Sequence, residues 1–263
     1  MRHLQALWVY RYFVISTIKT EFYTRLARSR LGIAWVVIHP LSQVAMYAFV
    51  LSAVLSSKLP GIESRYAYAI YLMAGMSAWT LFLEVTNRSL NVFIDNANLL
   101  KKMAFPKLTL PVVIAGSSLL SNLILLMAIL VVFGLLGHFP FYALKWLPLL
   151  ILLNLSLALS FGLVLGILHV FIRDIGQLMP MVLQLWFWLT PIVYIASIIP
   201  EQFHFLMSLN PMHAIVMGYQ AILAYGKAPD IVTLLYPLAL TIIMASVAAW
   251  MYKKSNEEMA DVL

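Results

Sequence analysis

The sequence predicts an all-α integral membrane protein that forms a single domain over residues 1–263. Of the 263 residues, 63% are hydrophobic and 10% are charged, whereas soluble domains contain roughly 45–50% apolar and about 25% charged residues. A helix needs about 20 apolar residues to cross a hydrocarbon core of about 30 Å. Six stretches are long enough: 31–55, 66–86, 110–136, 147–172, 178–199 and 231–252. We therefore expect six transmembrane helices in a membrane domain at 31–252.

The basic residues predict how these helices are oriented. Thirteen of the 17 lysines and arginines precede the first stretch, lie in the second or fourth connection, or follow the last stretch. The other four are Lys58, Arg65, Lys145 and Lys227. Because cytoplasmic loops carry an excess of basic residues, we expect both termini and the tail at 253–263 in the cytoplasm. The first thirty residues contain several arginines and no short apolar core before a cleavage site, so we expect no signal peptide.

Residues 1–30 predict an N-terminal amphipathic helix that lies in the cytoplasmic interface of the membrane. The apolar side chains recur at helical spacing: Val14, Ile15, Ile18, Phe22 and Leu26. An apolar span follows within a few residues, which favours the membrane surface as the partner of this face. A helix docked on a soluble partner would show the same pattern.

The second connection, which we expect in the cytoplasm, predicts a short helix at 95–105, with the sequence DNANLLKKMAF. Asp95 or Asn96 can cap its start, and lysines lie near its end, where positive charge is favourable. Pro106 stops it, because the residue before proline is forced out of the helical region. A short helix joined to two spans is suited to pass a push from a soluble partner into the membrane. A solvated loop that only fixes the topology is the alternative interpretation.

The segment at 201–225 is interrupted at Asn210-Pro211, which leaves two amphipathic pieces, 201–209 and 212–225. Each piece is too short to cross the membrane. Irregular backbone at membrane depth is tolerated only against protein or water. We therefore expect two re-entrant helices that enter from the outer face and form a gate over the mouth of a pathway.

Aromatic residues are concentrated in the second and fifth spans. They are Trp79, Phe82, Trp186, Phe187, Trp188 and Tyr194, and Pro191 is expected to bend the fifth helix. Some belong to the belt of tryptophan and tyrosine at membrane interfaces. Aromatic faces also bind amphipathic ligands such as sugars, so a substrate path is the other interpretation. Gly162 and Gly166 form a small-x-x-x-small pattern that fits either internal packing or a dimer face.

Residues for catalysis are nearly absent from the sequence. The aspartates are scattered, the histidines are isolated, and no phosphate-binding loop is present, so we expect no catalytic residue, metal site or bound cofactor. If ATP drives the protein, another chain must bind it. Glu84 is the only carboxylate in the six stretches, which argues against a proton- or sodium-coupled carrier. The membrane topology accounts for the net charge of +7, so no nucleic-acid partner is expected.

Four stretches together resemble the permease subunit of ATP-binding-cassette exporters of O-antigen, capsular polysaccharide and teichoic acid. They are RSRLGIAWVVIHPLSQVAMYAFV (28–50), NRSLNVFIDNANLLKKMAFPKLTLP (87–111), FIRDIGQLMPMVLQLWFWLTPIVY (171–194) and NPMHAIVMGYQAIL (210–223). Their order and spacing agree with this family over nearly the whole chain. In many members a basic-aromatic pair replaces Leu26-Ala27, and arginine is common in place of Gln220.

The resemblance implies a non-catalytic membrane subunit that moves a polysaccharide linked to polyprenyl pyrophosphate, with O-antigen as the expected cargo. It implies a homodimer in the bacterial cytoplasmic (inner) membrane and two nucleotide-binding subunits that hold ATP and magnesium. A related exporter of drugs or small lipids is the alternative. A membrane enzyme acting on polyprenyl lipids is a third interpretation, and it requires an acid, base or metal cluster.

The resemblance also implies three groups of site residues. The helix at 95–105 becomes a coupling helix that contacts the ATPase through Asn96, Asn98, Leu99, Leu100, Lys101, Lys102, Met103 and Phe105. The entrance for the lipid pyrophosphate is formed by Arg25, Arg28, Arg30 and Arg88. The glycan channel is lined by Trp79, Phe82, Trp186, Phe187, Trp188 and Tyr194.

Overall fold

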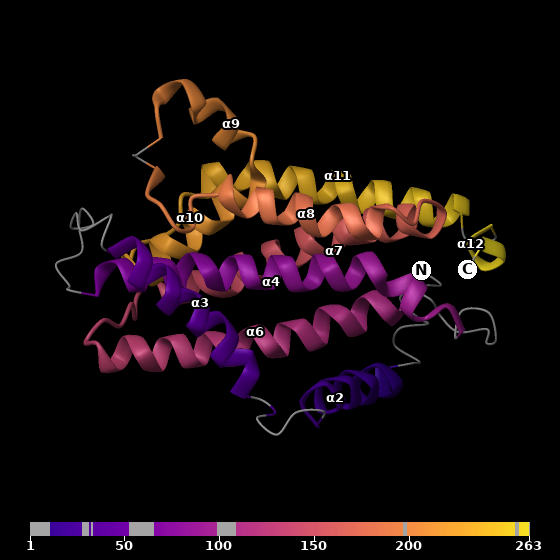
Figure 1. Cartoon of the computed structure of the whole chain (residues 1–263), viewed down its shortest axis with the longest axis horizontal. Coiled ribbons are helices and arrows are strands. Elements are labelled where there is room, and N and C mark those ends of the chain that lie inside the picture. Colours follow the sequence, from indigo (N-terminus) through magenta and orange to yellow (C-terminus); the bar gives the residue numbers. More distant parts are fainter. Residues whose placement is uncertain are drawn as a thin grey trace.

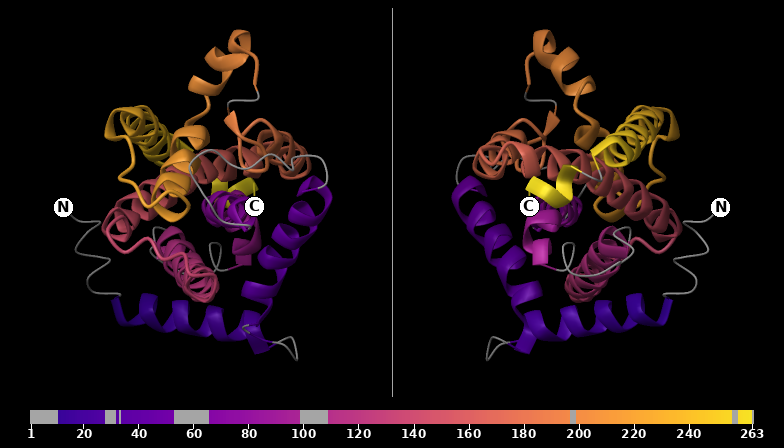
Figure 2. Two further views of the ribbon diagram at one scale, coloured as in Figure 1. Left: turned by 90° about the vertical axis from the view of Figure 1, so that its left-hand side faces the viewer. Right: turned by 90° about the vertical axis from the view of Figure 1, so that its right-hand side faces the viewer.

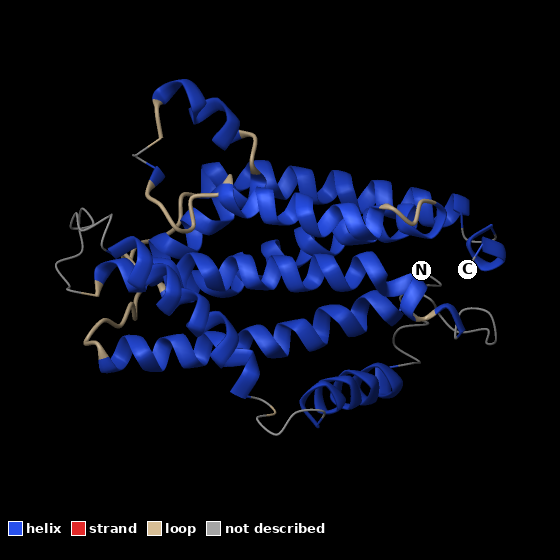
Figure 3. Ribbon diagram, viewed as in Figure 1, coloured by secondary structure: helices blue, strands red, loops and turns tan. Residues whose placement is uncertain are grey.

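The computed structural model describes residues 11–27, 32, 34–52, 66–98, 109–196, 199–255 and 258–262. Every regular element in these residues is a helix, which confirms the all-α class (Figure 3). Among the described residues, four helices are long and apolar enough to cross a membrane. They are α4 (Ala67–Asp95), α6 (Thr109–Leu135), α7 (Leu147–Phe171) with the short η1 (Leu144–Trp146) before it, and α11 (Ile231–Ser255). The count of six spans stays a prediction.

Helix α4 lies at the centre of the bundle (Figures 1 and 2). It packs against α6, α7 and α10. In the most apolar part of α4, 78% of the residues are buried, compared with 22% in α11 at the periphery. Gly162 and Gly166 of α7 allow its close approach to α4. A Cβ atom at Gly166 would lie 2.4 Å from the carbonyl oxygen of Ser89. Both glycines therefore serve internal packing, the first of their two expected roles.

The predicted interface helix is α2 (Arg11–Ala27), which lies across α6 at the edge of the bundle (Figure 2). Val14 is buried, and Ile18 packs against the backbone of Gly116, where an added Cβ atom would lie 2.5 Å from Ile18 Cδ1. Helix α3 (Ala34–Ser52) follows, has 19 residues and falls within the first predicted span.

The second and fifth predicted helices have different ends in the structure. Helix α4 continues beyond 86 to Asp95, so Asp95 ends a long helix and does not start a short one. Asn96 follows as the C-cap, with its Nδ2 donating to the carbonyl of Val92 at 2.8 Å. Residues 97 and 98 are helical, and the remainder of the predicted coupling helix lies outside the described residues.

Helix α8 (Ile175–Trp188) has 14 residues and ends well before the predicted limit at 199. The prediction that Pro191 bends this helix is therefore wrong, because the helix ends three residues before it. Proline has no backbone N–H, and its ring clashes with the carbonyl four residues earlier, so the helix stops there. Fourteen residues are fewer than the roughly 20 that a crossing helix needs.

The predicted interruption at Asn210-Pro211 is confirmed. The first piece forms η3 (Glu201–Phe203) and α9 (His204–Ser208), which project from the bundle (Figure 1). Asn210 caps α10 (Pro211–Leu223), whose apolar residues are almost entirely buried against α4, α7 and α11. Proline suits the first position of a helix because its missing N–H would have no partner there. The short α12 (Glu258–Val262) ends the described chain and buries Met259.

Candidate functional site

Helices α3, α4 and α8 enclose a groove with a volume of about 390 Å³. α3 and α8 both pack beside α4, as the end views show (Figure 2). The groove follows one face of α4 from Met76 through Leu83 to Asn87, positions that recur every three or four residues. This spacing brings side chains onto one side of a helix. The groove therefore extends along the bundle for about three turns of α4.

Four aromatic side chains form part of its wall: Tyr47, Trp79, Phe187 and Trp188. The ring centroids of Tyr47 and Phe187 are 5.9 Å apart in a stacked arrangement, and those of Trp79 and Phe187 are 5.6 Å apart edge to face. Phe187 is buried, whereas Trp188 is 50% exposed. The cluster is thus packed on one side and presents an open aromatic surface on the other.

The polar part of the wall consists of uncharged side chains and one histidine: His39, Gln43, Thr80, Asn87 and Gln184. None of the described residues that line the groove is Asp, Glu, Lys or Arg. Gln43, Gln184 and Tyr47 were not among the residues predicted from the sequence to form a site. The two glutamines could have been found from the sequence, because polar side chains in apolar helices face the protein interior or an aqueous cavity.

The structure brings together three of the six predicted channel aromatics, Trp79, Phe187 and Trp188, and places the other three elsewhere. Phe82 is fully buried, with its ring centroid 5.3 Å from that of Trp186. Tyr194 donates its hydroxyl to the carbonyl of Trp188 at 2.9 Å. Two tryptophans of α8 that are two residues apart therefore have different environments, since Trp188 lines the groove and Trp186 packs against the core.

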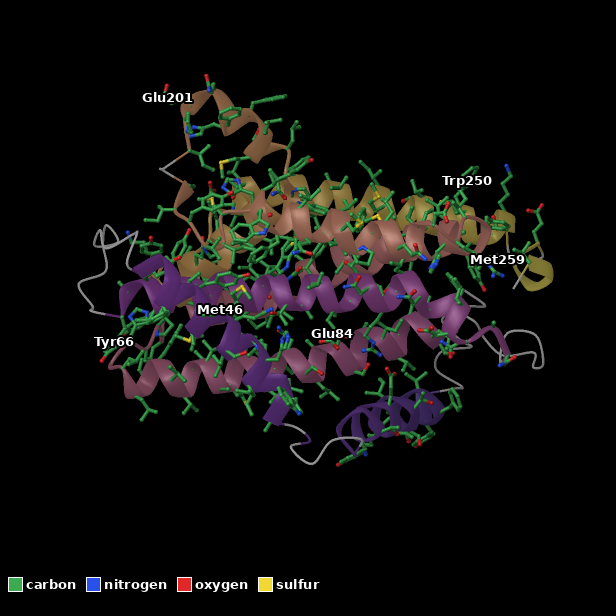
Figure 4. The ribbon with its side chains drawn as sticks, in the orientation of Figure 1. Met46, Tyr66, Glu84, Glu201, Trp250 and Met259 are labelled. Atoms are coloured by element: carbon green, nitrogen blue, oxygen red, sulfur yellow. The ribbon has the colours of Figure 1, made fainter. Side chains whose placement is uncertain are left out.

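Arg88, one of the predicted pyrophosphate residues, joins three helices. Its guanidinium donates to Ser117 Oγ and Ser118 Oγ of α6, both at 2.7 Å, and forms an ion pair with Glu21 of α2. Glu84 lies 3.7 Å from the same guanidinium, between α4 and α6 (Figure 4). The side chain of Arg88 is 18% exposed. These contacts hold the interface helix against the bundle.

The other predicted charged sites are only partly described. Arg25 belongs to α2, but its side chain is outside the described part of the chain, as are Arg28 and Arg30. Asn96 and Asn98 lie directly after α4. The other residues predicted to contact the ATPase lie outside the described residues: Leu99, Leu100, Lys101, Lys102, Met103 and Phe105.

The backbone after α8 is held by side chains of α4 and α10. The carbonyl of Pro191 accepts hydrogen bonds from the Tyr71 hydroxyl at 3.2 Å and from Gln220 Nε2 at 3.1 Å. The carbonyl of Val193 accepts one from the Tyr68 hydroxyl at 2.6 Å. An unpaired carbonyl inside a membrane protein costs several kcal/mol. These donors therefore pair the backbone carbonyls that follow α8 inside the bundle. We call the five residues the carbonyl clamp: Tyr68, Tyr71, Pro191, Val193 and Gln220.

Asn210 connects the end of α8 with the start of α10. Its Oδ1 accepts hydrogen bonds from Trp186 Nε1 at 2.8 Å and from the backbone N–H of Met212 at 3.0 Å. Its Nδ2 donates to Thr190 Oγ1 at 2.9 Å. One side chain thus caps a helix and binds a second one. The sequence predicted the interruption at this residue but not its partners.

Comparison with known proteins gives a family match and several relatives. A model of the family described as ABC-2 type transporter matches residues 13–224. The O-antigen export system permease protein RfbA of Myxococcus xanthus is 25% identical, and the alignment covers 99% of each chain. Its namesake in Klebsiella pneumoniae is 26% identical over 91% of this chain and 90% of its own. The polysialic acid transport protein KpsM of Escherichia coli is 21% identical over 91% of this chain and 92% of its own.

Proposed function

Because the chain belongs to the ABC-2 type transporter family, we propose that it is the membrane subunit of an ATP-driven polysaccharide exporter. Its cargo is O-antigen, carried on polyprenyl pyrophosphate across the bacterial inner membrane. Two separate nucleotide-binding subunits hold ATP and magnesium and perform the hydrolysis. A second copy of this chain completes the membrane pathway, and both termini are cytoplasmic.

The observation that carries the proposal is the alignment with the Myxococcus xanthus permease, which covers 99% of each chain. Similarity over this length includes the segments around the groove, the carbonyl clamp and Asn210. The groove gives independent support, because aromatic faces and uncharged hydrogen-bonding side chains suit sugar rings. Trp79, Phe187 and Trp188 are the aromatic residues of our proposed glycan path.

Helix α4 supports the proposed coupling to an ATPase. It runs without interruption from Ala67 to Asp95 and packs against α3, α6, α7, α8 and α10. A displacement of the segment at 96–105 would therefore move the central helix of the bundle, which also forms one wall of the groove. We propose that Asn96, Asn98 and the residues at 99–105 contact the nucleotide-binding subunit.

The proposed entrance for the lipid pyrophosphate rests on Arg25, Arg28 and Arg30. Arginine binds phosphate oxygens through two parallel hydrogen bonds, a geometry that lysine lacks. The guanidinium of Arg88 already bonds Glu21 and two serines, so we assign Arg88 the task of positioning α2.

Deletion of the gene in its own organism tests the proposed function. We expect surface polysaccharide to disappear and lipid-linked polysaccharide to accumulate in the cytoplasmic leaflet, with both effects reversed by the intact gene. The control strain carries an inactive Walker A lysine variant of the partner ATPase and should show the same accumulation. Normal surface polysaccharide in the deletion strain would instead support an exporter of drugs or small lipids.

A further inference from the structure

The polar side chains that line the groove between α3, α4 and α8 are uncharged apart from His39, and export of polysaccharide does not by itself require this. A path for polysaccharide can be lined by cations, which bind acidic sugars, or by uncharged groups. Gln43, Thr80, Asn87 and Gln184 provide amide and hydroxyl groups. Amides and hydroxyls offer both donors and acceptors. Sugar hydroxyls also donate and accept, so the two sets are complementary.

We propose that this groove selects uncharged sugar residues, so that the exported polysaccharide is a neutral glycan and not a polyanion. The inference rests on the proposed function and specifies its substrate class. Family membership leaves this question open, because the description of the family names no class of sugar.

The first argument is the lack of a cationic partner. A carboxylate that leaves water is stable only if it is paired or fully hydrogen-bonded, and arginine and lysine are the side chains that pair it. No described residue that lines the groove is an arginine or lysine. Arg88 follows Asn87 in sequence, but its guanidinium bonds Glu21, Ser117 and Ser118 and does not line the groove.

The second argument concerns His39, the single described lining residue that is able to carry a positive charge. It is an exposed residue of α3. One imidazole supplies at most one cation, whereas an acidic polysaccharide carries a carboxylate in each repeat. A chain that passes through the groove would therefore bring several unpaired anions past uncharged side chains.

The third argument is the aromatic wall. The face of an aromatic ring carries the negative part of its quadrupole and attracts cations. The same faces stack on the C–H surface of uncharged sugars and are unfavourable for carboxylates. Trp188, which is 50% exposed, and Tyr47, 6.2 Å from it between centroids, form this part of the wall.

The test uses the permease and its ATPase reconstituted in proteoliposomes with two polyprenyl-pyrophosphate-linked glycans of equal length. One is a galactose polymer, and the other has galacturonic acid in each repeat. We expect the neutral glycan to be translocated about tenfold faster. A tenfold ratio corresponds to a difference of roughly 1.4 kcal/mol, which is within the cost of leaving a buried polar group unpaired. Equal rates, or faster export of the acidic glycan, would overturn the inference while the proposed export function stands. If neither glycan moves, the proposed function fails and the inference fails with it.

Two variants at one position determine whether the groove causes the selectivity. Gln184→Lys adds a cation to the wall and should reduce the preference for the neutral glycan about threefold, whereas Gln184→Glu should increase it by a similar factor. Opposite shifts support the assignment to the groove. If both variants change the ratio in the same direction, or leave it unchanged, the selectivity arises elsewhere and the assignment is wrong. If either variant does not assemble with the ATPase, the ratio of the two translocation rates in the unaltered protein decides whether the inference stands.

Discussion

Gln220 donates its side-chain amide to the carbonyl of Pro191 at 3.1 Å, although 29 residues separate them in the chain. Tyr71 donates to the same oxygen at 3.2 Å. The two donors come from α10 and α4, so a single carbonyl joins three segments. The side chain of Gln220 is uncharged, so it makes this junction without adding a charge to the bundle.

The first prediction concerns the carbonyl clamp. Tyr71→Phe and Gln220→Met each remove one donor and keep most of the side-chain volume. Each should lower the free energy of unfolding by about 1 kcal/mol, and the double variant by about 3 kcal/mol, because only the double variant leaves the Pro191 carbonyl unpaired. Thermal unfolding of the purified protein measures this. Tyr142→Phe, at a residue 92% exposed, is the matched control, and an equal loss there would contradict the prediction.

The second prediction concerns Asn210. Asn210→Ala removes the cap of α10 and the acceptor for the indole of Trp186, and should destabilise the protein by about 1–2 kcal/mol. Trp186→Phe removes the donor and part of the ring that packs against Phe82. In a double-mutant cycle the combined loss should be smaller than the sum of the single losses, because both variants break the same bond. Strict additivity, measured by thermal unfolding, would refute the coupling.

The third prediction concerns the contact between α2 and the bundle. The chain contains no cysteine, so Ile18→Cys with Gly116→Cys introduces one pair, which mild oxidation should cross-link. Adding Arg88→Met leaves the carboxylates of Glu21 and Glu84 without this guanidinium and should slow cross-linking several-fold, a loss of about 1 kcal/mol. Lys19→Met, on the exposed side of α2, is the control. Unchanged cross-linking in the Arg88 variant would show that α2 is held by apolar contacts alone.

The fourth prediction concerns the contact with the ATPase. Replacing Leu99, Leu100 and Met103 together with aspartate should detach the partner while membrane insertion stays normal, because the proposed coupling role would put the new charges in a partner cleft and not in the bilayer. Co-purification of the ATPase and its rate of ATP hydrolysis are the measurements. Alanine at the same three positions should have a weaker effect. Full export and normal co-purification in the aspartate variant would exclude this segment as the coupling element.

The fifth prediction concerns topology. Single cysteines at Gly61 and Gln202 should react with an impermeant maleimide in intact cells, whereas one at Asn98 should react only after the membrane is opened. The physical reason is the excess of basic residues on the side where we expect both termini. Reaction at position 98 but not at 61 in intact cells would reverse the assignment.

Several elements follow from the sequence because their causes are local. The apolar stretches at 110–136, 147–172 and 231–252 correspond to α6, α7 and α11, whose observed starts differ from prediction by no more than one residue. The length of an apolar run sets the length of a helix in a membrane. The interruption at Asn210 also follows from local chemistry, since asparagine caps helices and proline starts them.

Other features depended on contacts between distant segments. No local signal ends α4 at 86, and the buried residues of α4 continue to Phe93, whose ring stacks on Tyr252 of α11. The carbonyls of Pro191 and Val193, beyond the end of α8 at Trp188, are paired by side chains of α4 and α10. Sequence periodicity shows which residues share a face but not which neighbour that face contacts.

The sequence by itself determined that this chain is a helical membrane protein and which aromatic residues are concentrated in two segments. It also determined, to within one residue, where α4, α6, α7 and α11 start. The tertiary structure decided which of those aromatics form a surface. Trp186 and Trp188 are two residues apart, yet Trp186 bonds Asn210 and Trp188 lines the groove. Successive positions on a helix are 100° apart, so the rotation of α8 against α3, α4 and α10 alone assigned one tryptophan to the core and the other to the groove.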